Sequence, residues 1–217
     1  MILPLFLDTD DCQFFDRDAR AAITEVCAAT AAEVRRLLPE LPSIIEVAAQ
    51  TGTSVIAETG EAGAALRATR IRWIVDPTRP GGIAVIARAQ LRATLFHELH
   101  HVARGWVIES GKARTSFMDA VVSEGLATAF ERDAAGRRSP WGEYPEDVAA
   151  WVEELLGLPR DAPYRTWMFK HTDGRQWVGY RAGTYIVDQA KRVSGLSAAR
   201  MVKVPTREIL AMAGLPI

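Results

Sequence analysis

The sequence predicts an α+β fold, with an N-terminal lobe of one helix and several strands followed by a C-terminal lobe that is mostly helical. Short apolar runs separated by glycine and proline fill residues 1–88, as in a sheet. Residues 89–104 show helical spacing and hold three of the four histidines. Helical patterns dominate the rest of the chain, and this order is typical of an α+β protein. We therefore expect one domain over residues 1–217, with lobes at about 1–88 and 89–217 around the histidine-rich helix.

The composition is that of an ordinary globular protein, with 48% hydrophobic and 24% charged residues in a chain of 217. A net charge of −1 gives no electrostatic basis for binding nucleic acid or an anionic membrane. Cys12 and Cys27 match neither a zinc spacing nor a disulfide framework, so we expect both to pack as small apolar residues in a reducing compartment. The apolar stretch 1–7 is too short to span a bilayer, and Asp8, Asp10 and Asp11 follow it, which argues against a signal peptide. These features favour a cytoplasmic protein.

The N-terminal lobe begins with Ile2 to Leu7, an apolar run that reads as a strand. Asp16 or Asp18 can cap a helix that runs to about Leu38, where proline ends it. The other expected elements are strands over 43–48 and 53–57, a loop over 59–63, a strand over 69–75 and a further short apolar run over 83–86. One helix and four or five strands should therefore form this lobe.

The central helix carries the pattern His-Glu-x-x-His, formed by His97, Glu98 and His101. The two histidines stand four residues apart, so on a helix they lie one turn apart on the same face and can bind one Zn²⁺ together. Glu98 can reach a water on that metal. Good helix formers lead into the pattern, and Gly105 is a stop signal after it. His100 is displaced about 100° around the helix from His101, so we expect it to support the ligands or to line the cleft wall.

After Gly105 the next expected helix is capped by Ser116, with Asp119 three residues later, and ends near Gly136. The other expected elements are a helix starting at Pro145 and ending at Gly157, an irregular segment over 158–176, a helix over 178–193 and short helical pieces near 198–199 and 205–210. No repeat or interdomain linker interrupts this lobe.

A catalytic zinc commonly takes three protein ligands and leaves one position for water. One extended zinc-peptidase pattern would need glycine at Arg104 and histidine at Val107, so it does not match. Glu124 is the candidate third ligand, because it lies among small residues of an apolar helix, where a buried glutamate is rare unless it is paired. Glu131 and Glu109 are alternatives that lie nearer to helix or loop ends. A surface glutamate or one paired with arginine is the plainer interpretation of Glu124.

Three stretches together resemble the bacterial family of predicted zinc-dependent proteases: His-Glu-Leu-His-His at 97–101, Ser-Glu-Gly-Leu-Ala at 123–127 and Gly-Tyr-Arg-Ala-Gly-Thr-Tyr-Ile-Val at 179–187. The second is also similar to the third-ligand helix of the large zinc aminopeptidases. The resemblance covers roughly residues 80–195. It implies a zincin-like fold and a gluzincin-type peptidase site, with the third ligand a glutamate on a later helix.

The third stretch has its own physical interpretation. Gly179 and Gly183 expose backbone on one helix face and permit close packing against a neighbour. Tyr180 lies beside that face and is the first candidate for stabilising the oxyanion of peptide hydrolysis, with His171 and Arg181 next. A packing tyrosine with a satisfied hydroxyl is the alternative.

The sequence thus predicts a zinc-dependent hydrolase of peptide or protein substrates, in which His97, His101 and Glu124 hold Zn²⁺. The metal would lower the pKa of its water from about 15.7 toward about 7. Glu98 would take the proton and pass it to the leaving amine. Two alternatives stay open: a non-catalytic or regulatory metal-binding module of the same fold, and a hydrolase of a non-peptide amide or ester. The presence of Glu98 argues against the first, because a structural metal site needs no base.

Overall fold

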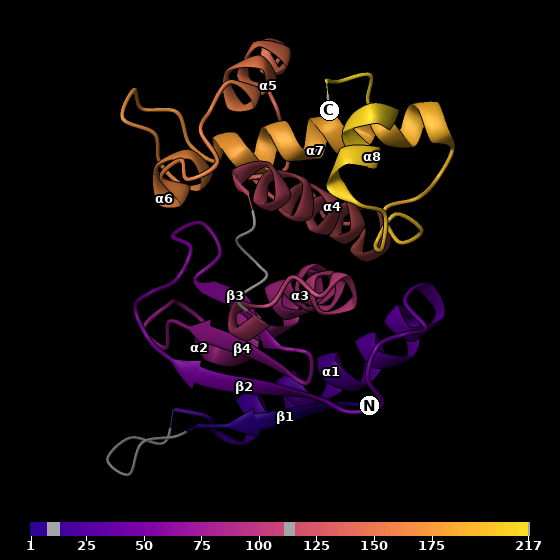
Figure 1. Cartoon of the computed structure of the whole chain (residues 1–217). Helices are drawn as coiled ribbons and strands as arrows, with labels where there is room; N and C mark the ends of the chain where they lie inside the picture. The colour runs from indigo at the N-terminus through magenta and orange to yellow at the C-terminus, as the bar shows by residue number, and fades with distance from the viewer. Residues whose placement is uncertain (8–13, 111–115, 217) are drawn as a thin grey trace. The chain divides into compact units, whose positions relative to one another are not determined.

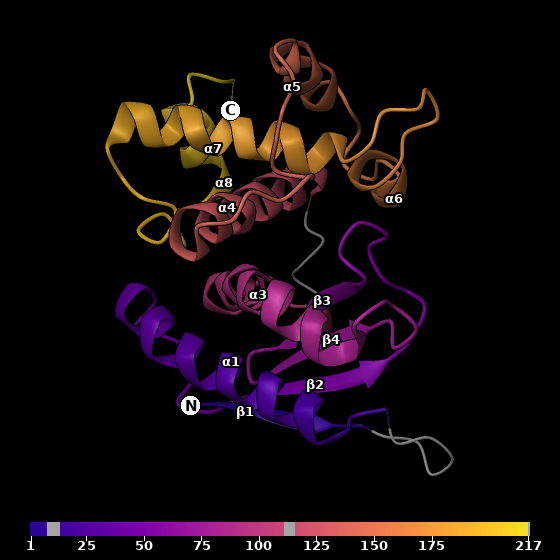
Figure 2. The same cartoon turned by 180° about the vertical axis from the view of Figure 1, so that it is seen from behind.

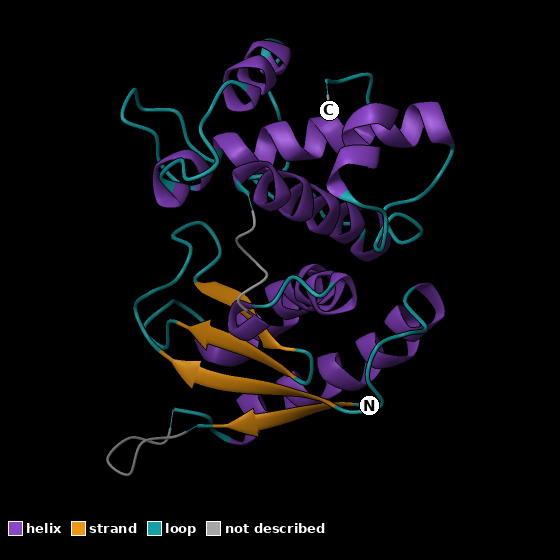
Figure 3. Cartoon of the chain, in the orientation of Figure 1, coloured by secondary structure: helices purple, strands orange, loops and turns teal. Residues whose placement is uncertain are grey.

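The computed structural model describes residues 1–7, 14–110 and 116–216. The chain divides into two compact units, Met1–Ser110 and Gly111–Ile217. All strands of the described residues lie in the first unit, and the second is built from helices (Figure 3). The expected α+β class is therefore confirmed. The boundary falls after Ser110, so the histidine-rich helix is part of the first unit, whereas the expected lobe boundary at 88/89 would place it in the second.

The first unit contains a four-stranded sheet in the order β1-β2-β4-β3. Its parallel strands are β1 (Ile2–Phe6), β2 (Ile45–Thr51) and β4 (Arg70–Val75), with Ile2 opposite Ile45 and Val47 opposite Ile71. The edge strand β3 (Glu61–Arg67) pairs antiparallel with β4. The alternation of side chains puts Ile45, Val47 and Trp73 on one buried face.

Helices cover that buried face. Helix α1 (Arg17–Leu37) connects β1 to β2, and the Asp16 carboxylate caps it by accepting a hydrogen bond of 2.8 Å from the Ala19 N–H. Figures 1 and 2 show α1 and the short α2 (Gly82–Ile86) on the same side of the sheet. Cys27 is buried in α1, and this burial raises the pKa of its thiol to about 12, so it packs as an apolar group as expected. Cys12 and the acidic residues at 8, 10 and 11 lie outside the described residues.

Three expectations for this unit were wrong in part. Residues 53–57 form no strand, and Ile56 makes only an isolated bridge to Glu61. The expected loop over 59–63 instead contains the start of β3 at Glu61. The apolar run over 83–86 belongs to α2. Strand β3 is rich in alanine and has little intrinsic β preference, so its pairing with β4, a tertiary effect, determines its conformation.

Helix α2 continues into the histidine-rich helix through a π-helical turn. This turn, η1 (Ala87–Leu91), leads directly into α3 (Arg92–Arg104), which ends at Gly105 in the left-handed conformation with φ 81°. Ion pairs connect this segment to α1, from Arg88 to Asp18 at 2.6 Å and from Arg92 to Glu33 at 2.7 Å. A short 3₁₀ turn, η2 (Ile108–Ser110), closes the unit.

The second unit begins with α4 (Phe117–Ala135), whose cap is Ser116: its Oγ accepts from the Asp119 N–H at 3.1 Å, as expected. Helices α4 and α7 (Val178–Ser194) lie side by side at its centre (Figures 1 and 2). The other helices are α5 (Val148–Leu156), α6 (Tyr164–Met168) and α8 (Thr206–Met212). The segment 158–176 is therefore less irregular than expected, because it contains α6 and a bridge between Lys170 and Gln176.

Candidate metal centre

The two histidines of the His-Glu-x-x-His pattern face each other on α3. The Nε2 atoms of His97 and His101 are 3.1 Å apart, and their ring planes are inclined by 79°. Both side chains are buried. Helical spacing places one imidazole a turn above the other, so the ring nitrogens converge on one point beside the helix.

This geometry fits a zinc ion. Two Zn–N bonds of about 2.0–2.1 Å at a tetrahedral angle hold their nitrogens about 3.3 Å apart, close to the separation of 3.1 Å between the two Nε2 atoms. Imidazole nitrogen is also among the ligands that zinc prefers. The first unit therefore supplies two imidazoles in an arrangement that could bind a metal ion.

Glu98 is held by the backbone of the edge strand. Its Oε2 accepts a hydrogen bond of 2.7 Å from the Ala65 N–H of β3, and the side chain is buried. Gly63 on the same strand makes room for it: a Cβ there would lie 2.8 Å from Glu98 Cγ and 2.5 Å from Thr94 Cγ2. The absence of a side chain at Gly63 thus permits strand and helix to approach closely. Because Gly63 falls in the expected loop over 59–63, the sequence alone did not indicate this role.

A second buried acid connects α3 to the sheet. The Glu61 carboxylate accepts hydrogen bonds from Trp73 Nε1 at 2.7 Å and from the Thr94 hydroxyl at 2.9 Å. Thr94 lies one turn before Glu98 on α3. Glu61 therefore helps to fix the helix that carries the candidate base, a role that the sequence alone did not indicate. His100 is fully buried, and its expected supporting role stays a prediction.

In the second unit, Glu124 is buried near the middle of α4. Its Oε1 accepts a hydrogen bond of 3.4 Å from the hydroxyl of Tyr164, the first residue of α6. Of the two alternative ligands, Glu131 is also buried on α4, whereas Glu109 is exposed in the 3₁₀ turn of the first unit. Tyr164 was not identified from the sequence, because it falls within the segment expected to be irregular.

Glycine determines how closely α4 and α7 cross. A Cβ on Gly125 would lie 2.2 Å from the carbonyl of Gly183, and a Cβ on Gly183 would lie 2.1 Å from the Val121 oxygen. Gly179, one turn earlier, faces Met168 of α6, whose sulfur would be 2.0 Å from an added Cβ. The expected close packing of the Gly179 and Gly183 face is confirmed. Gly125, next to Glu124, supplies the matching surface on α4.

Tyr180 belongs to an aromatic cluster of the second unit. Its ring centroid lies 5.7 Å from that of Trp177 and 6.2 Å from that of Phe169, and Tyr164 contacts Phe169 at 6.0 Å. Trp177 has φ 59°, a left-handed conformation that is uncommon for a bulky residue. Two tyrosines, one predicted and one missed, therefore share the neighbour Phe169.

The other two candidates for oxyanion stabilisation have structural partners. Arg181 donates to the Pro140 carbonyl at 3.2 Å. His171 stacks on Trp167 at 4.2 Å between centroids, and its Nδ1 lies 2.9 Å from an Asp173 carboxylate oxygen. The backbone N–H of Arg175 and further hydrogen bonds hold the pKa of Asp173 at about 2, so it stays ionised beside His171. Both residues therefore have a packing role of their own.

A family model described as a predicted Zn-dependent protease matches residues 24–211. The chain belongs to this family. The matched range includes the histidines and Glu98 of α3, Glu124 of α4 and Tyr180 of α7. No protein of curated function matches the chain.

Membership in this family of predicted Zn-dependent proteases agrees with the histidine geometry on α3, which fits zinc independently of any sequence comparison. The family description thus supports zinc as the metal and a protease as the class of activity. Within the described part of the chain, no helix has the length and apolar character needed to cross a membrane.

Proposed function

We propose that this chain is a zinc-dependent hydrolase that cleaves peptide bonds. The observation that carries the proposal is the approach of His97 Nε2 to His101 Nε2 at 3.1 Å, next to a glutamate held by a backbone N–H. A ligand pair with an adjacent carboxylate is the arrangement that metal-assisted hydrolysis requires. In terms of fold, the proposal is a zincin-like domain of the gluzincin type.

His97, His101 and Glu124 are the proposed ligands. Two observations on the second unit support Glu124: it is buried near the middle of α4, and it accepts a hydrogen bond from Tyr164. A hydrogen bond to a ligating carboxylate orients that ligand and tunes its basicity. When bound, zinc would polarise a carbonyl and make water acidic enough to act as a nucleophile near neutral pH.

Glu98 is the proposed general base and acid. The Ala65 N–H donates to Oε2 and thereby restrains the orientation of the carboxylate. The carboxylate would accept a proton from the attacking water and then transfer it to the nitrogen of the leaving amine. A fixed orientation favours both transfers, because no reorientation of the side chain precedes them.

Tyr180 is the proposed donor to the oxyanion that forms at the scissile carbonyl. Its place in the aromatic cluster supports a defined hydroxyl position, since its ring contacts Trp177 and Phe169. Tyr164 is the competing candidate, because its hydroxyl already contacts Glu124. Phe variants separate them: Tyr180→Phe should lower kcat by about 10²–10³-fold and leave zinc bound. Loss of turnover from Tyr164→Phe alone, in protein that still holds its zinc, would transfer the role to Tyr164.

The proposed substrate is a peptide or protein. The proposed compartment is the cytoplasm, where free thiols such as Cys27 stay reduced.

The test combines metal analysis with a peptide library. Purified wild-type protein should hold about one zinc per chain, and His97→Ala and His101→Ala should each lose it. His171→Ala is the matched control and should keep its zinc. Wild type should cleave members of a proteome-derived peptide library, detected by mass spectrometry, and Glu98→Gln should not. Full zinc occupancy in His101→Ala, or equal cleavage by wild type and Glu98→Gln, would overturn the proposal.

A further inference from the structure

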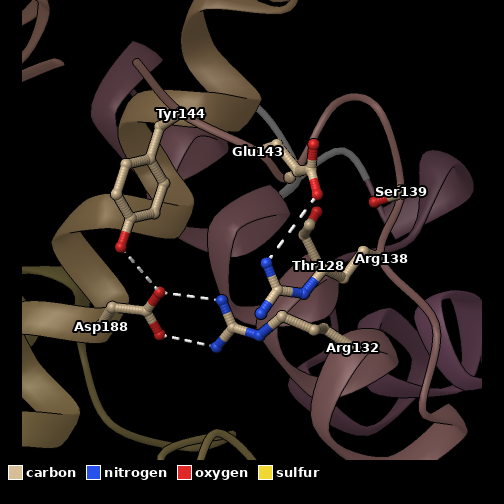
Figure 4. Close-up of a pocket in the computed structure, with 8 residues that line it drawn as sticks. Thr128, Arg132, Arg138, Ser139, Glu143, Tyr144 and Asp188 are labelled. Carbon is tan, nitrogen blue, oxygen red and sulfur yellow. Dashed lines mark hydrogen bonds and ion pairs between the residues drawn. The ribbon is translucent and has the colours of Figure 1, made fainter. Parts of the chain in front are cut away.

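The second unit contains a pocket of about 520 Å³ beside the α4–α7 pair. The chain leaves α4 at Gly136, turns at Ser139–Gly142 and returns along the helix, so that this returning segment forms one wall. The pocket is within the range of 300–1,000 Å³ typical of small-molecule sites. Figure 4 shows its lining residues, which are Thr128, Arg132, Arg138, Ser139, Gly142, Glu143, Tyr144 and Asp188.

One lining residue contributes a buried hydroxyl that the protein does not satisfy. Thr128 is 1% exposed, and its Oγ1 has no hydrogen-bond partner among the described residues. Not every buried threonine in the helices of this unit has an unsatisfied hydroxyl. Thr184 on α7 is equally buried, and its hydroxyl donates to the Tyr180 carbonyl at 2.8 Å. Because an unsatisfied buried hydroxyl costs free energy, a polar ligand group that reached Thr128 would gain a hydrogen bond there.

Gly142 allows the returning segment to approach Thr128 and Ser139 closely. A Cβ at Gly142 would lie 2.6 Å from Thr128 Cγ2 and 3.1 Å from the Ser139 hydroxyl oxygen. Ser139 is itself buried. The Thr128 methyl group and the Ser139 hydroxyl therefore both lie next to a position where the returning segment carries no side chain.

The inner wall is formed by Arg132 and Asp188, whose opposite charges already pair with each other. Arg132 donates two hydrogen bonds to Asp188, at 2.8 and 2.7 Å, and the Tyr144 hydroxyl donates to the same carboxylate at 3.2 Å. Burial alone would raise the pKa of Asp188, but the hydrogen bonds and charge of Arg132 outweigh it and hold that pKa below its usual value. These groups shape the pocket and leave little charge for a ligand.

The rim is different, because it carries one loosely paired positive and one loosely paired negative group. Arg138 and Glu143 approach only to 3.9 Å, and their side chains are 78% and 63% exposed. An ion pair so exposed contributes little stability, since water screens both charges. Figure 4 shows both side chains at the pocket with this single contact between them. A ligand with one group of each charge can replace this contact with two better ones.

We propose that this pocket binds a small zwitterion, a free α-amino acid or a short peptide. The carboxylate would pair with the Arg138 guanidinium, whose fork geometry suits two parallel hydrogen bonds. The ammonium group would pair with Glu143, and the Thr128 and Ser139 hydroxyls would bond to the polar end that enters deepest. None of these lining residues has a role in the proposed hydrolysis, although the ligand class includes the products of peptide hydrolysis.

Isothermal titration calorimetry on the intact Glu98→Gln protein tests the inference, because this variant cannot consume a peptide and the result does not depend on hydrolysis. The probes are the common L-amino acids and the dipeptide Ala-Ala, each compared with its N-acetylated and its C-amidated form. We expect at least one zwitterion to bind with a Kd between about 10 μM and 1 mM. Removing either terminal charge should weaken that binding at least about tenfold.

Variants then assign the binding to this pocket. Arg138→Gln and Glu143→Gln should each weaken it at least about tenfold, whereas Arg192→Gln, an exposed arginine of α7, should have no effect. Thr128→Val should weaken binding without lowering the midpoint of urea unfolding, because it removes a hydroxyl that has no partner. Thr184→Val is the matched control, and it should lower that midpoint and leave binding unchanged.

Three results would overturn the inference. The first is the absence of heat from every zwitterionic probe at millimolar concentration. The second is binding that survives both Arg138→Gln and Glu143→Gln. The third is binding of acetate or inorganic phosphate as tightly as the zwitterions with no effect of Glu143→Gln, which would make this an anion site.

Discussion

Two buried carboxylates on two long helices are held by different kinds of donor. In the first unit, Glu98 accepts from a backbone N–H of a strand, Ala65, at 2.7 Å. In the second, Glu124 accepts from a side-chain hydroxyl, that of Tyr164, at 3.4 Å. A backbone donor within a sheet moves only if the strand moves, whereas a tyrosine hydroxyl moves with its side chain. The Ala65 donor to the proposed base is therefore fixed more firmly than the Tyr164 donor to the proposed third ligand.

The surroundings of the two acids extend this contrast. Helix α3 packs on a sheet, with Gly63 opposite Glu98 and with Glu61 bound to Thr94. Helix α4 depends on another helix, through the Gly125 and Gly183 crossing. In the first unit a mutation near the acid should therefore change the chemistry. In the second it should change metal affinity or the stability of the helix pair.

The largest expected effect is that of Glu98→Gln. The amide can keep the bond to the Ala65 N–H, but it cannot accept a proton, so kcat should fall by about 10²–10⁴-fold with zinc still bound. Steady-state kinetics on a cleaved peptide and metal analysis give the two measurements. Glu124→Gln should show the opposite pattern, with loss of zinc first. Equal zinc loss in both variants would remove the distinction between base and ligand.

Gly63→Ala tests whether the rigid placement of Glu98 matters. The added methyl would lie 2.8 Å from Glu98 Cγ, so the carboxylate must shift, and kcat should fall by about 10²-fold. KM should change less than kcat. Ala64→Ser, at the neighbouring position on the opposite face of the strand, is the control and should retain wild-type kinetics. Wild-type kcat in Gly63→Ala would show that the base tolerates displacement.

Gly183→Ala should act on stability instead. Its Cβ would lie 2.1 Å from a backbone oxygen that cannot rotate away, and overpacking of this kind costs about 1–3 kcal/mol of unfolding free energy. Urea unfolding followed by circular dichroism measures the loss. Gly157→Ala is the matched control, because Gly157 has ordinary helical angles and its nearest neighbour would be 3.5 Å from the added Cβ. Equal stability of the two variants would contradict the tight crossing.

Tyr164→Phe should weaken zinc binding by about 10–100-fold, as the loss of a hydrogen bond to a ligating carboxylate typically does. Competition with a chromogenic chelator measures the affinity. Tyr180→Phe serves as the comparison and should bind zinc as wild type does. If Tyr164→Phe has wild-type affinity, the Tyr164 hydroxyl does not orient a ligand.

The smallest expected effect concerns Asp188, which connects α7 to Arg132 of α4. Its pKa in the folded chain is below the usual value, so its ionised form stabilises the fold above the unfolded pKa of about 3.9. This contribution is lost as the pH falls through the folded pKa. Asp188→Asn should cost about 1–2 kcal/mol at pH 7, and the difference from wild type should shrink below about pH 4. A difference that is constant from pH 7 to pH 3 would show that the charge contributes nothing.

Much of the fold followed from sequence because strong local signals specified it. Asp16, Ser116 and Gly105 mark helix ends that the structure reproduces. Strand β3 was missed because its alanine-rich sequence has no local β signal and because pairing with β4 determines it. Helix α6 was missed because a single short turn has too little periodicity to stand out.

The candidate site, like the fold, could be predicted from the sequence only in part. His97, Glu98 and His101 were readable because one helix carries all three at fixed spacing. The groups around the two acids come from distant segments of the chain. Ala65 contributes a backbone N–H, Gly63 leaves space because it has no side chain, and Tyr164 contributes a hydroxyl from a short helix. None of these leaves a pattern along the chain, so only the three-dimensional arrangement reveals them.

The π-helical turn η1 also constrains which changes in chain length this protein can accept. A π turn holds one residue more than the α turn that it replaces, so it rotates α2 relative to α3 by about 100°. Deleting one residue, such as the exposed Ala89, would restore a uniform helix and swing Ile83 and Ile86 away from the core that they now fill. A relative that is one residue shorter between Ile86 and Arg92 must therefore carry a different apolar pattern before its histidines. In an alignment, such a one-residue difference would indicate that the core of the first unit is packed differently.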